Sequence, residues 1–134
     1  MPTRILIADD NLMVRRALRT LIETNSEWKV CAEAGNGREA IAKAFELTPD
    51  LIVMDFLMPG LNGIQAAREI GKGGPAMPML LCTMYLTTQL AEEAQAAGFG
   101  AAVSKDMSGH VMAGIGALLR HESFFPREDF ESVW

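Results

Sequence analysis

Five short apolar runs, separated by stretches with helical spacing, constrain the fold of this chain more than any other feature. Each run is too short for a helix and is bounded by residues that favour turns, which predicts a strand. The runs occupy positions 4–8, 29–34, 51–54, 79–82 and 101–104. The intervening segments place apolar residues on one face of a helix, as Val14, Ala17, Leu18, Leu21 and Ile22 do.

Strands that alternate with helices predict an α/β fold with a doubly wound parallel sheet and helices on both of its faces. Asn11, Asn36 and either Thr87 or Thr88 are suited to begin helices, and Gly98 is suited to follow the end of one. With 134 residues and 49% hydrophobic content, the chain is expected to form a single folded unit.

Polar residues stand where four of the predicted strands end. Asp9 and Asp10 follow the first run, Asp55 the third, Thr83 the fourth and Lys105 the fifth. In an open parallel sheet, ligands bind in the crevice beyond the carboxyl ends of the strands. We therefore expect these five side chains to form one site.

Three neighbouring carboxylates repel one another unless one takes up a proton or a cation neutralises them. Mg²⁺ suits such a group because it prefers oxygen ligands and leaves room for phosphate in its shell. An ionised Asp is a competent nucleophile, and Lys105 would stabilise incoming phosphoryl charge. These residues indicate phosphoryl transfer that yields an aspartyl phosphate on Asp55.

The motifs resemble those of the receiver domains of bacterial two-component response regulators, over residues 3 to 121. The matching pieces are IADDN at 7–11, MDFLMPGLNG at 54–63, LCT at 81–83 and VSKD at 103–106. The resemblance implies that Asp55 is the phosphoacceptor. It also implies that Asp10, Asp55 and the backbone carbonyl of Leu57 bind Mg²⁺ directly, with Asp9 acting mainly through water.

By the same resemblance, Thr83 is the switch hydroxyl and Lys105 pairs with the phosphoryl group. The implied fold is flavodoxin-like, with five strands in the order 2-1-3-4-5. The phosphodonor would be a histidine kinase or a histidine phosphotransfer protein, and the output would be a protein contact such as a homodimer. The variant Ser104-Lys105-Asp106 is common in regulators with LuxR-type helix-turn-helix outputs.

Several positions depart from the family pattern or modulate it. Receivers usually carry an aromatic residue where this chain has Ala102, so the usual aromatic readout is absent. Leu57 and Tyr85, with Met84 beside them, would flank the mouth of the site. Because neither Leu57 nor Tyr85 is a small polar residue able to orient a hydrolytic water, we predict slow self-dephosphorylation.

The alternative from another class is a Mg²⁺-dependent phosphatase with an Asp nucleophile. Such enzymes commonly place a second Asp two residues after the first, where this chain has Leu57. We therefore expect a phosphoryl-accepting switch and not a turnover enzyme. A nucleotide- or flavin-binding module is disfavoured because no Gly-rich phosphate loop follows the first strand.

The net charge of −5 argues against non-specific binding of nucleic acid, and we do not expect this chain itself to bind DNA. No apolar run reaches membrane length and no signal-peptide pattern is present, so a cytoplasmic location is expected.

Cys31 and Cys82 are predicted to be buried reduced thiols. Arg15, Arg16 and Arg19 form a basic cluster that we interpret as a solvated helix face, with a docking patch as the alternative.

The chain is divided by these observations into a receiver-like domain at 1–121 and a C-terminal extension, or the start of an interdomain linker, at 122–134. The extension contains Phe124, Phe125, Phe130 and Trp134 among charged residues, which is unusual for a disordered tail. Three alternatives remain open: it folds back on the last helix, it contacts a second subunit, or it leads into a further domain. His110 and His121 are predicted to be ordinary surface residues.

Overall fold

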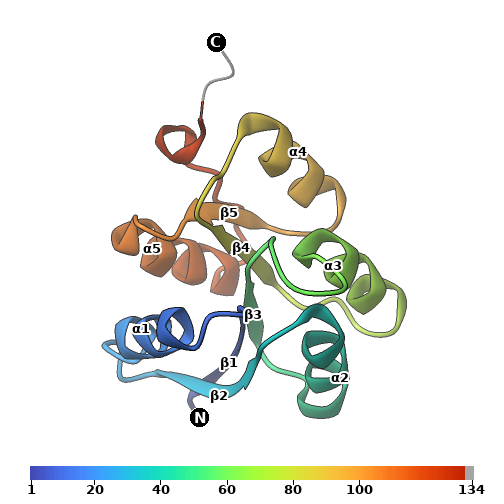
Figure 1. Ribbon diagram of the computed structural model, residues 1–134. Coiled ribbons are helices and arrows are strands. Elements are labelled where there is room, and N and C mark those ends of the chain that lie inside the picture. Colours follow the sequence, from blue (N-terminus) through green and yellow to red (C-terminus); the bar gives the residue numbers. More distant parts are fainter. Residues whose placement is uncertain (132–134) are drawn as a thin grey trace.

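The five apolar runs form the strands of one parallel sheet, shown in Figure 1 as a computed structural model that describes residues 1–131. The strands follow the order β2-β1-β3-β4-β5, which confirms the predicted topology. Their bounds are β1 Thr3–Ala8, β2 Trp28–Ala34, β3 Leu51–Met54, β4 Met79–Thr83 and β5 Ala101–Ser104. Residues of β3 and β4 are buried throughout, as expected for strands covered on both faces.

Helices connect the strands and lie on both sides of the sheet. They are α1 Leu12–Ile22, α2 Gly37–Leu47, α3 Gly63–Lys72, α4 Thr88–Ala96 and α5 Ser108–Leu119, followed by the 3-10 turn η1 Arg127–Asp129. Figure 1 shows α1 and α5 on one face and α2, α3 and α4 on the other. Within residues 1–131, no helix is long and apolar enough to cross a bilayer.

Side-chain caps fix where most of the helices begin. The Asn11 side chain accepts hydrogen bonds from the backbone N–H groups of Met13 and Val14. Asn36 and Thr87 cap α2 and α4 in the same way, which confirms these predictions and selects Thr87 over Thr88. Asn62 forms a reciprocal capping box with Gln65 at α3.

Two apolar clusters hold the helices against the sheet. One packs α1 and α5 on residues such as Ile5, Val53 and Val103, and the other packs α2, α3 and α4 on residues such as Leu6 and Met54. Burial of each large aliphatic side chain contributes roughly 1.5–3 kcal/mol to the stability of the fold. The strand ends are therefore held by a core on both faces of the sheet.

Residues 122–131, which we call the C-terminal segment, fold back along the free edge of β5. Phe124 donates its backbone N–H to Gly100 O at 2.9 Å and accepts from Ala102 N at 3.1 Å. The segment ends beside the β4–α4 loop, where the backbone N–H of Glu131 donates to Leu86 O at 2.8 Å. Trp134, one of the four aromatic residues noted in the sequence, lies outside the described residues.

Candidate functional site

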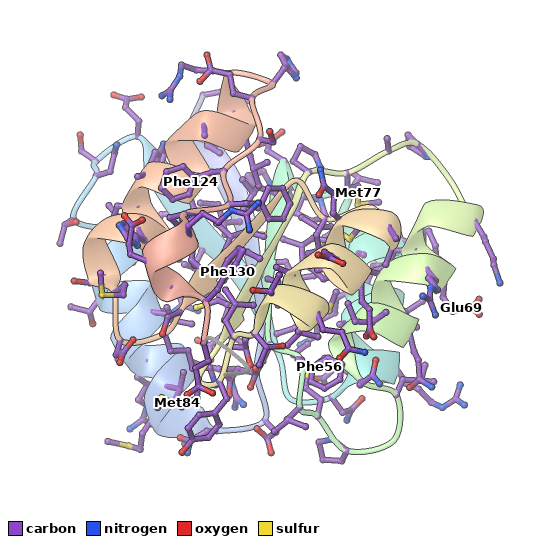
Figure 2. The ribbon with its side chains drawn as sticks, turned by 90° about the horizontal axis from the view of Figure 1, so that it is seen from above. Phe56, Glu69, Met77, Met84, Phe124 and Phe130 are labelled. Carbon is purple, nitrogen blue, oxygen red and sulfur yellow. The ribbon has the colours of Figure 1, made fainter. Side chains whose placement is uncertain are left out.

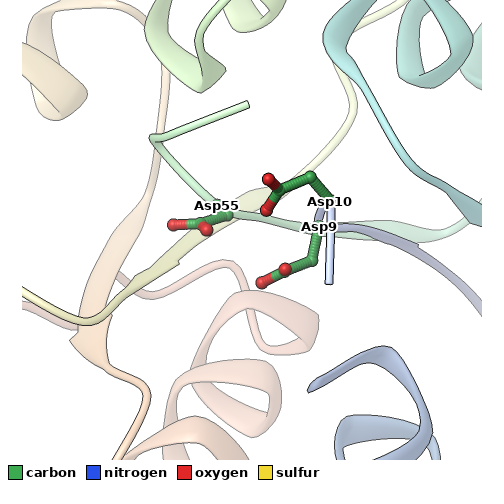
Figure 3. Close-up of side chains that lie close together, drawn as sticks. All are labelled: Asp9, Asp10 and Asp55. Atoms are coloured by element: carbon green, nitrogen blue, oxygen red, sulfur yellow. The ribbon is translucent and has the colours of Figure 1, made fainter. Parts of the chain in front are cut away.

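Strand register brings the two buried acids together. Ala8 on β1 lies opposite Met54 on β3, so the residues that follow them, Asp9 and Asp55, leave neighbouring strands at the same level. The backbone N–H of Asp55 continues the ladder by donating to Ala8 O at 2.9 Å. Figure 3 shows the carboxylates of Asp9, Asp10 and Asp55 gathered at this edge of the sheet, as the sequence predicted.

Lys105 is the cation that faces the two buried acids. Its Nζ lies 2.6 Å from Asp9 Oδ2 and 2.8 Å from Asp55 Oδ2. Burial alone would lower the pKa of Lys105, but hydrogen bonding and attraction to Asp55 and Asp9 raise it above its ordinary value. The lysine therefore stays charged in the folded protein at neutral pH.

Asp55 is held from two directions and is only 5% exposed. Its Oδ1 accepts a hydrogen bond from the backbone N–H of Phe56 at 2.7 Å, and its Oδ2 accepts one from Lys105. Burial raises the pKa of the Asp55 carboxyl above its ordinary value, although Lys105 opposes this shift. The Asp9 charge raises this pKa further.

Thr83 and Lys105 reach the site from the next pair of strands. Thr83 lies opposite Ser104 in the β4–β5 register, and the backbone N–H of Lys105 donates to Thr83 O at 3.0 Å. The turn after β5 is stabilised by a hydrogen bond from the Ser104 hydroxyl to Asp106 and by one from Met107 N to Ser104 O at 3.1 Å. These two contacts hold the turn that carries Lys105.

The acidic group has the donor set for a hard divalent cation. One oxygen from each of Asp9, Asp10 and Asp55 lies within 4.8 Å of the other two. Asp9 Oδ2 faces the lysine ammonium but receives no well-directed hydrogen bond, which leaves a buried oxygen with bonding capacity to spare. Oxygen donors of this kind suit Mg²⁺.

An open cleft of about 590 Å³ leads to Asp55. Leu57, Met84 and Tyr85 line it and are 63%, 51% and 69% exposed, so they stand at its rim and leave the acceptor reachable. Ala102 is fully buried and lies outside this cleft, in the cluster beneath α4. Of the positions that the sequence singled out, Ala102 is therefore the one that does not meet the others at the site.

Two predictions, one about the arginine cluster and one about the thiols, were wrong in part. Arg15 and Arg19 do not form a purely solvated face, because both pair with Glu33 on β2, at 2.9 and 2.8 Å. Burial would raise the pKa of Glu33, but the hydrogen bonds and charges of the two arginines lower it below its ordinary value. Of the two free thiols, Cys82 is buried, which raises its pKa to about 12, whereas Cys31 is only partly buried.

His110 is not an ordinary surface residue. Its Nδ1 lies 2.6 Å from Asp129 Oδ1, and its ring meets the ring of Phe124 edge to face. Asp129 also accepts a hydrogen bond from the backbone N–H of Ser104, the residue before Lys105, at 2.8 Å. Sequence reasoning missed Asp129, and the aromatic residues around it were the sole signal that this segment packs on the domain.

Asp55→Asn is expected to raise thermal stability at neutral pH. Because the folded-state pKa of Asp55 lies above its unfolded value, ionisation of this carboxyl destabilises the native state as pH rises through the folded pKa. The amide removes that charge, while Lys105 keeps Asp9 as its partner. The gain should be present at pH 7 to 8, should shrink as pH falls through the folded-state pKa of the wild-type carboxyl, and should be absent below its unfolded-state pKa. Melting temperatures of both proteins from pH 3 to 8 test this, and a pH-independent difference would contradict it.

The comparisons with known proteins agree with this geometry. A family model described as "Response regulator receiver domain" matches residues 5–114. The response regulator protein VraR of Staphylococcus aureus is 36% identical over 129 residues, which make up 96% of this chain and 62% of that protein. The chain therefore spans less than two thirds of the length of this relative.

Solved structures resemble the whole described fold. A two-component response regulator of the LuxR family from Aurantimonas sp. SI85-9A1 superposes with a TM-score of 0.91 at 33% identity, covering 96% of this chain and 92% of that one. The response regulator domain of Thermotoga maritima CheB superposes with a TM-score of 0.80 at 29% identity, covering 90% and 96%.

Proposed function

Because this chain belongs to the family of response regulator receiver domains, we propose that it is a signalling switch in which Asp55 accepts a phosphoryl group. The observation that carries the proposal is the placement of Asp55. Its carboxylate is buried at the end of β3, contacts Lys105 and lies beside two further acids at the end of an open cleft. A nucleophile, a cation for phosphoryl charge and an entry path thus meet at one point.

The proposed step transfers a phosphoryl group to a carboxylate oxygen of Asp55. A new O–P bond forms as the P–N bond of a phosphohistidine breaks, and the imidazole leaves with the electron pair and takes a proton from solvent. With acetyl phosphate as donor, a P–O bond breaks and acetate leaves. The Asp55 carboxyl must be ionised to attack, and Lys105 favours that form.

Asp9, Asp10 and Asp55, joined by the backbone carbonyl of Leu57, are the residues that we propose hold Mg²⁺. Asp10 and Asp55 would bind directly, and Asp9 would act mainly through water. When bound, the ion would offset the repulsion among the carboxylates and the charge of the phosphoryl group. The Asp9 oxygen that lacks a well-directed hydrogen bond supports this assignment.

Thr83 and Lys105 would detect the phosphoryl group. Both line the cleft with Asp55, and Lys105 would exchange part of its pairing with Asp9 and Asp55 for phosphoryl oxygens. The Thr83 hydroxyl would donate to another of these oxygens. Because Thr83 leads directly into the β4–α4 loop, its movement would bias the surface formed by α4 and β5.

A histidine kinase or histidine phosphotransfer protein is the proposed donor. An apolar groove of about 340 Å³, lined by Val14, Leu18 and Leu21 of α1, adjoins the cleft through Met84 and Lys105. A helical donor lying in this groove would present its phosphohistidine at the mouth above Asp55. The proposed output is a protein contact, with a homodimer as the first candidate.

Intact mass after incubation with Mg²⁺ and acetyl phosphate tests the proposal. We expect one added phosphoryl group that requires both the divalent ion and Asp55, so Asp55→Asn and a sample with chelator stay unmodified. Gel filtration of the same samples reports dimer formation. Acetyl phosphate consumed catalytically without a stable adduct would instead favour the Mg²⁺-dependent phosphatase, and no adduct with no consumption would count against both.

The lifetime of the phosphoprotein gives a further prediction. Leu57 and Tyr85 line the cleft, and neither is a small polar residue able to orient a water for attack on phosphorus. In the double variant Leu57→Asn, Tyr85→Glu, one new hydrogen bond to that water, worth about 1 kcal/mol, should speed dephosphorylation roughly fivefold. Decay followed by intact mass measures this, and the single variant Met84→Leu controls for altered packing at the rim. Equal decay in the double variant and wild type would remove the idea that Leu57 and Tyr85 slow hydrolysis.

A further inference from the structure

The C-terminal segment contacts both loops that carry the phosphoryl-facing residues. On one side, Asp129 Oδ2 accepts a hydrogen bond from Ser104 N, directly before Lys105. On the other side, Glu131 N donates to Leu86 O, three residues after Thr83, and Glu131 pairs with Thr87 in a parallel bridge. The segment therefore joins the end of β5 to the β4–α4 loop from outside the cleft.

The contact at Asp129 is specific and buried. The side chain of Asp129 is 0% exposed, although the segment around it lies at the surface. One oxygen accepts from Ser104 N and the other lies 2.6 Å from His110 Nδ1 on α5. Burying a carboxylate costs free energy unless both of its oxygens have partners. Asp129 can therefore stay buried only while Ser104 N and His110 keep their present positions.

Aromatic residues of the segment pack on the apolar cluster beneath α4. Phe125 and Phe130 pack on the buried cluster that contains Ala102, Leu86 and Ala91. In Figure 2, Phe124 lies over α5 and Phe130 lies toward α4, on the side of the molecule that carries the free edge of β5.

We propose that the C-terminal segment is a latch on the phosphoacceptor site, closed by Asp129 and Glu131 and released when Asp55 is phosphorylated. The proposal rests on the proposed function, because it takes Thr83 and Lys105 to move toward a phosphoryl group. The hydrogen bonds from Glu131 N to Leu86 O and from Ser104 N to Asp129 form while Lys105 pairs with Asp9 and Asp55. A shift of either loop breaks contacts of the latch, and its release uncovers the edge of β5 and the side of α4.

Thermodynamic linkage makes this coupling reciprocal for binding equilibria. If a phosphoryl group on Asp55 weakens the latch, then a weakened latch strengthens binding of a phosphoryl mimic at Asp55 by the same factor. Asp129 is in this sense a positioning residue that acts on the site through Ser104 and Lys105. Coupling between sites in proteins commonly corresponds to a change of about fivefold or more in affinity.

Hydrogen exchange tests the first direction. Wild-type protein is treated with Mg²⁺ and acetyl phosphate, its added phosphoryl group is verified by intact mass, and exchange is followed at the amides of Ala102, Ser104, Phe124 and Glu131, which bond across the latch. We expect exchange at these amides to speed about tenfold or more. An adduct with unchanged exchange overturns the latch and leaves the proposed function standing. Absence of any adduct overturns the proposed function, and the latch with it.

Equilibrium binding of beryllofluoride with Mg²⁺, as a stable phosphoryl mimic, tests the reverse direction. Asp129→Ala removes both contacts of that carboxylate, and Glu131→Pro removes only the N–H that bonds Leu86 O, so the second variant serves if the first folds poorly. Each should bind the mimic at least fivefold more tightly than wild type. Glu122→Ala is the matched control, because Glu122 is an exposed acid of the same segment that pairs with Arg120. Affinity equal to wild type in both latch variants would overturn the proposal.

Discussion

Gly63→Ala is expected to destabilise the protein by about 3 kcal/mol, because overpacking a rigid site costs roughly 1–3 kcal/mol and the obstacle here is backbone. Gly63 is the first residue of α3, and a Cβ on it would lie 2.1 Å from the carbonyl oxygen of Asp55. The same residue donates its backbone N–H to Phe56 O at 2.8 Å, so the helix cannot retreat without losing this bond.

The matched control for this prediction is Gly71→Ala in the same helix. A Cβ on Gly71 meets nothing within 4 Å, so alanine should add about 0.5–1 kcal/mol of stability through helix propensity. Urea unfolding of the two variants beside wild type measures the contrast. Opposite signs are expected, and similar small effects at both positions would show that the start of α3 is not held against Asp55. If the Gly63 variant folds, its Asp55 carbonyl and the 56–62 loop must shift, so phosphorylation should fall with stability.

Lys105→Met is expected to have the second large effect, a loss of about 3–5 kcal/mol at neutral pH in the absence of divalent ions. Removal of one partner of a buried ion pair leaves an uncompensated charge, and here it leaves two, on Asp9 and Asp55. The loss should shrink in acid, since protonation of one carboxyl relieves the repulsion. Millimolar Mg²⁺ should also recover part of it if the acids hold the ion.

In the wild type, the contribution of Lys105 has a defined pH range. Its pKa is raised in the folded state, so the native state binds this proton more tightly than the unfolded chain does. The stability that the charged lysine gives is therefore present below its ordinary pKa of 10.5. It is lost as pH rises through the folded-state pKa. Lys72→Met is the control, because Lys72 is 73% exposed and its pair with Glu69 should contribute at most about 1 kcal/mol. Denaturant unfolding at pH 5, 7 and 9, with chelator and with Mg²⁺, separates these effects. Equal losses in both variants at pH 7 would contradict the prediction.

The sheet and the acidic group could be predicted because both depend on local pattern. Short buried strands leave continuous apolar runs, and parallel strands bring their carboxyl ends to one edge, so Asp9 and Asp55 meet whatever the loops do. The caps at Asn11 and Asn36 are likewise set by residues within three positions of each other. Such features depend on residues that are close together in the sequence, so they can be predicted before the fold is known.

Other features could not be predicted because they depend on contacts between distant parts of the chain. Position 63 needs glycine because the start of α3 lies against the backbone of Asp55. No local sequence pattern predicts this close approach. The pairing of Asp129 with His110 and Ser104 joins residues 19 and 25 positions apart. The aromatic residues of the C-terminal segment indicated packing, but they did not indicate that the segment would bond along the edge of β5.

The hydrogen bonds of the C-terminal segment along β5 also affect the tendency of this protein to self-associate at high concentration. β5 is the last strand of the sheet, and an edge strand with free N–H and C=O groups is a template for intermolecular strand pairing. Phe124 and Asp129 fill the outward-facing positions of Gly100, Ala102 and Ser104. A chain shortened to residue 121 would lose its last thirteen residues and leave this edge without a partner, so self-association and aggregation should follow.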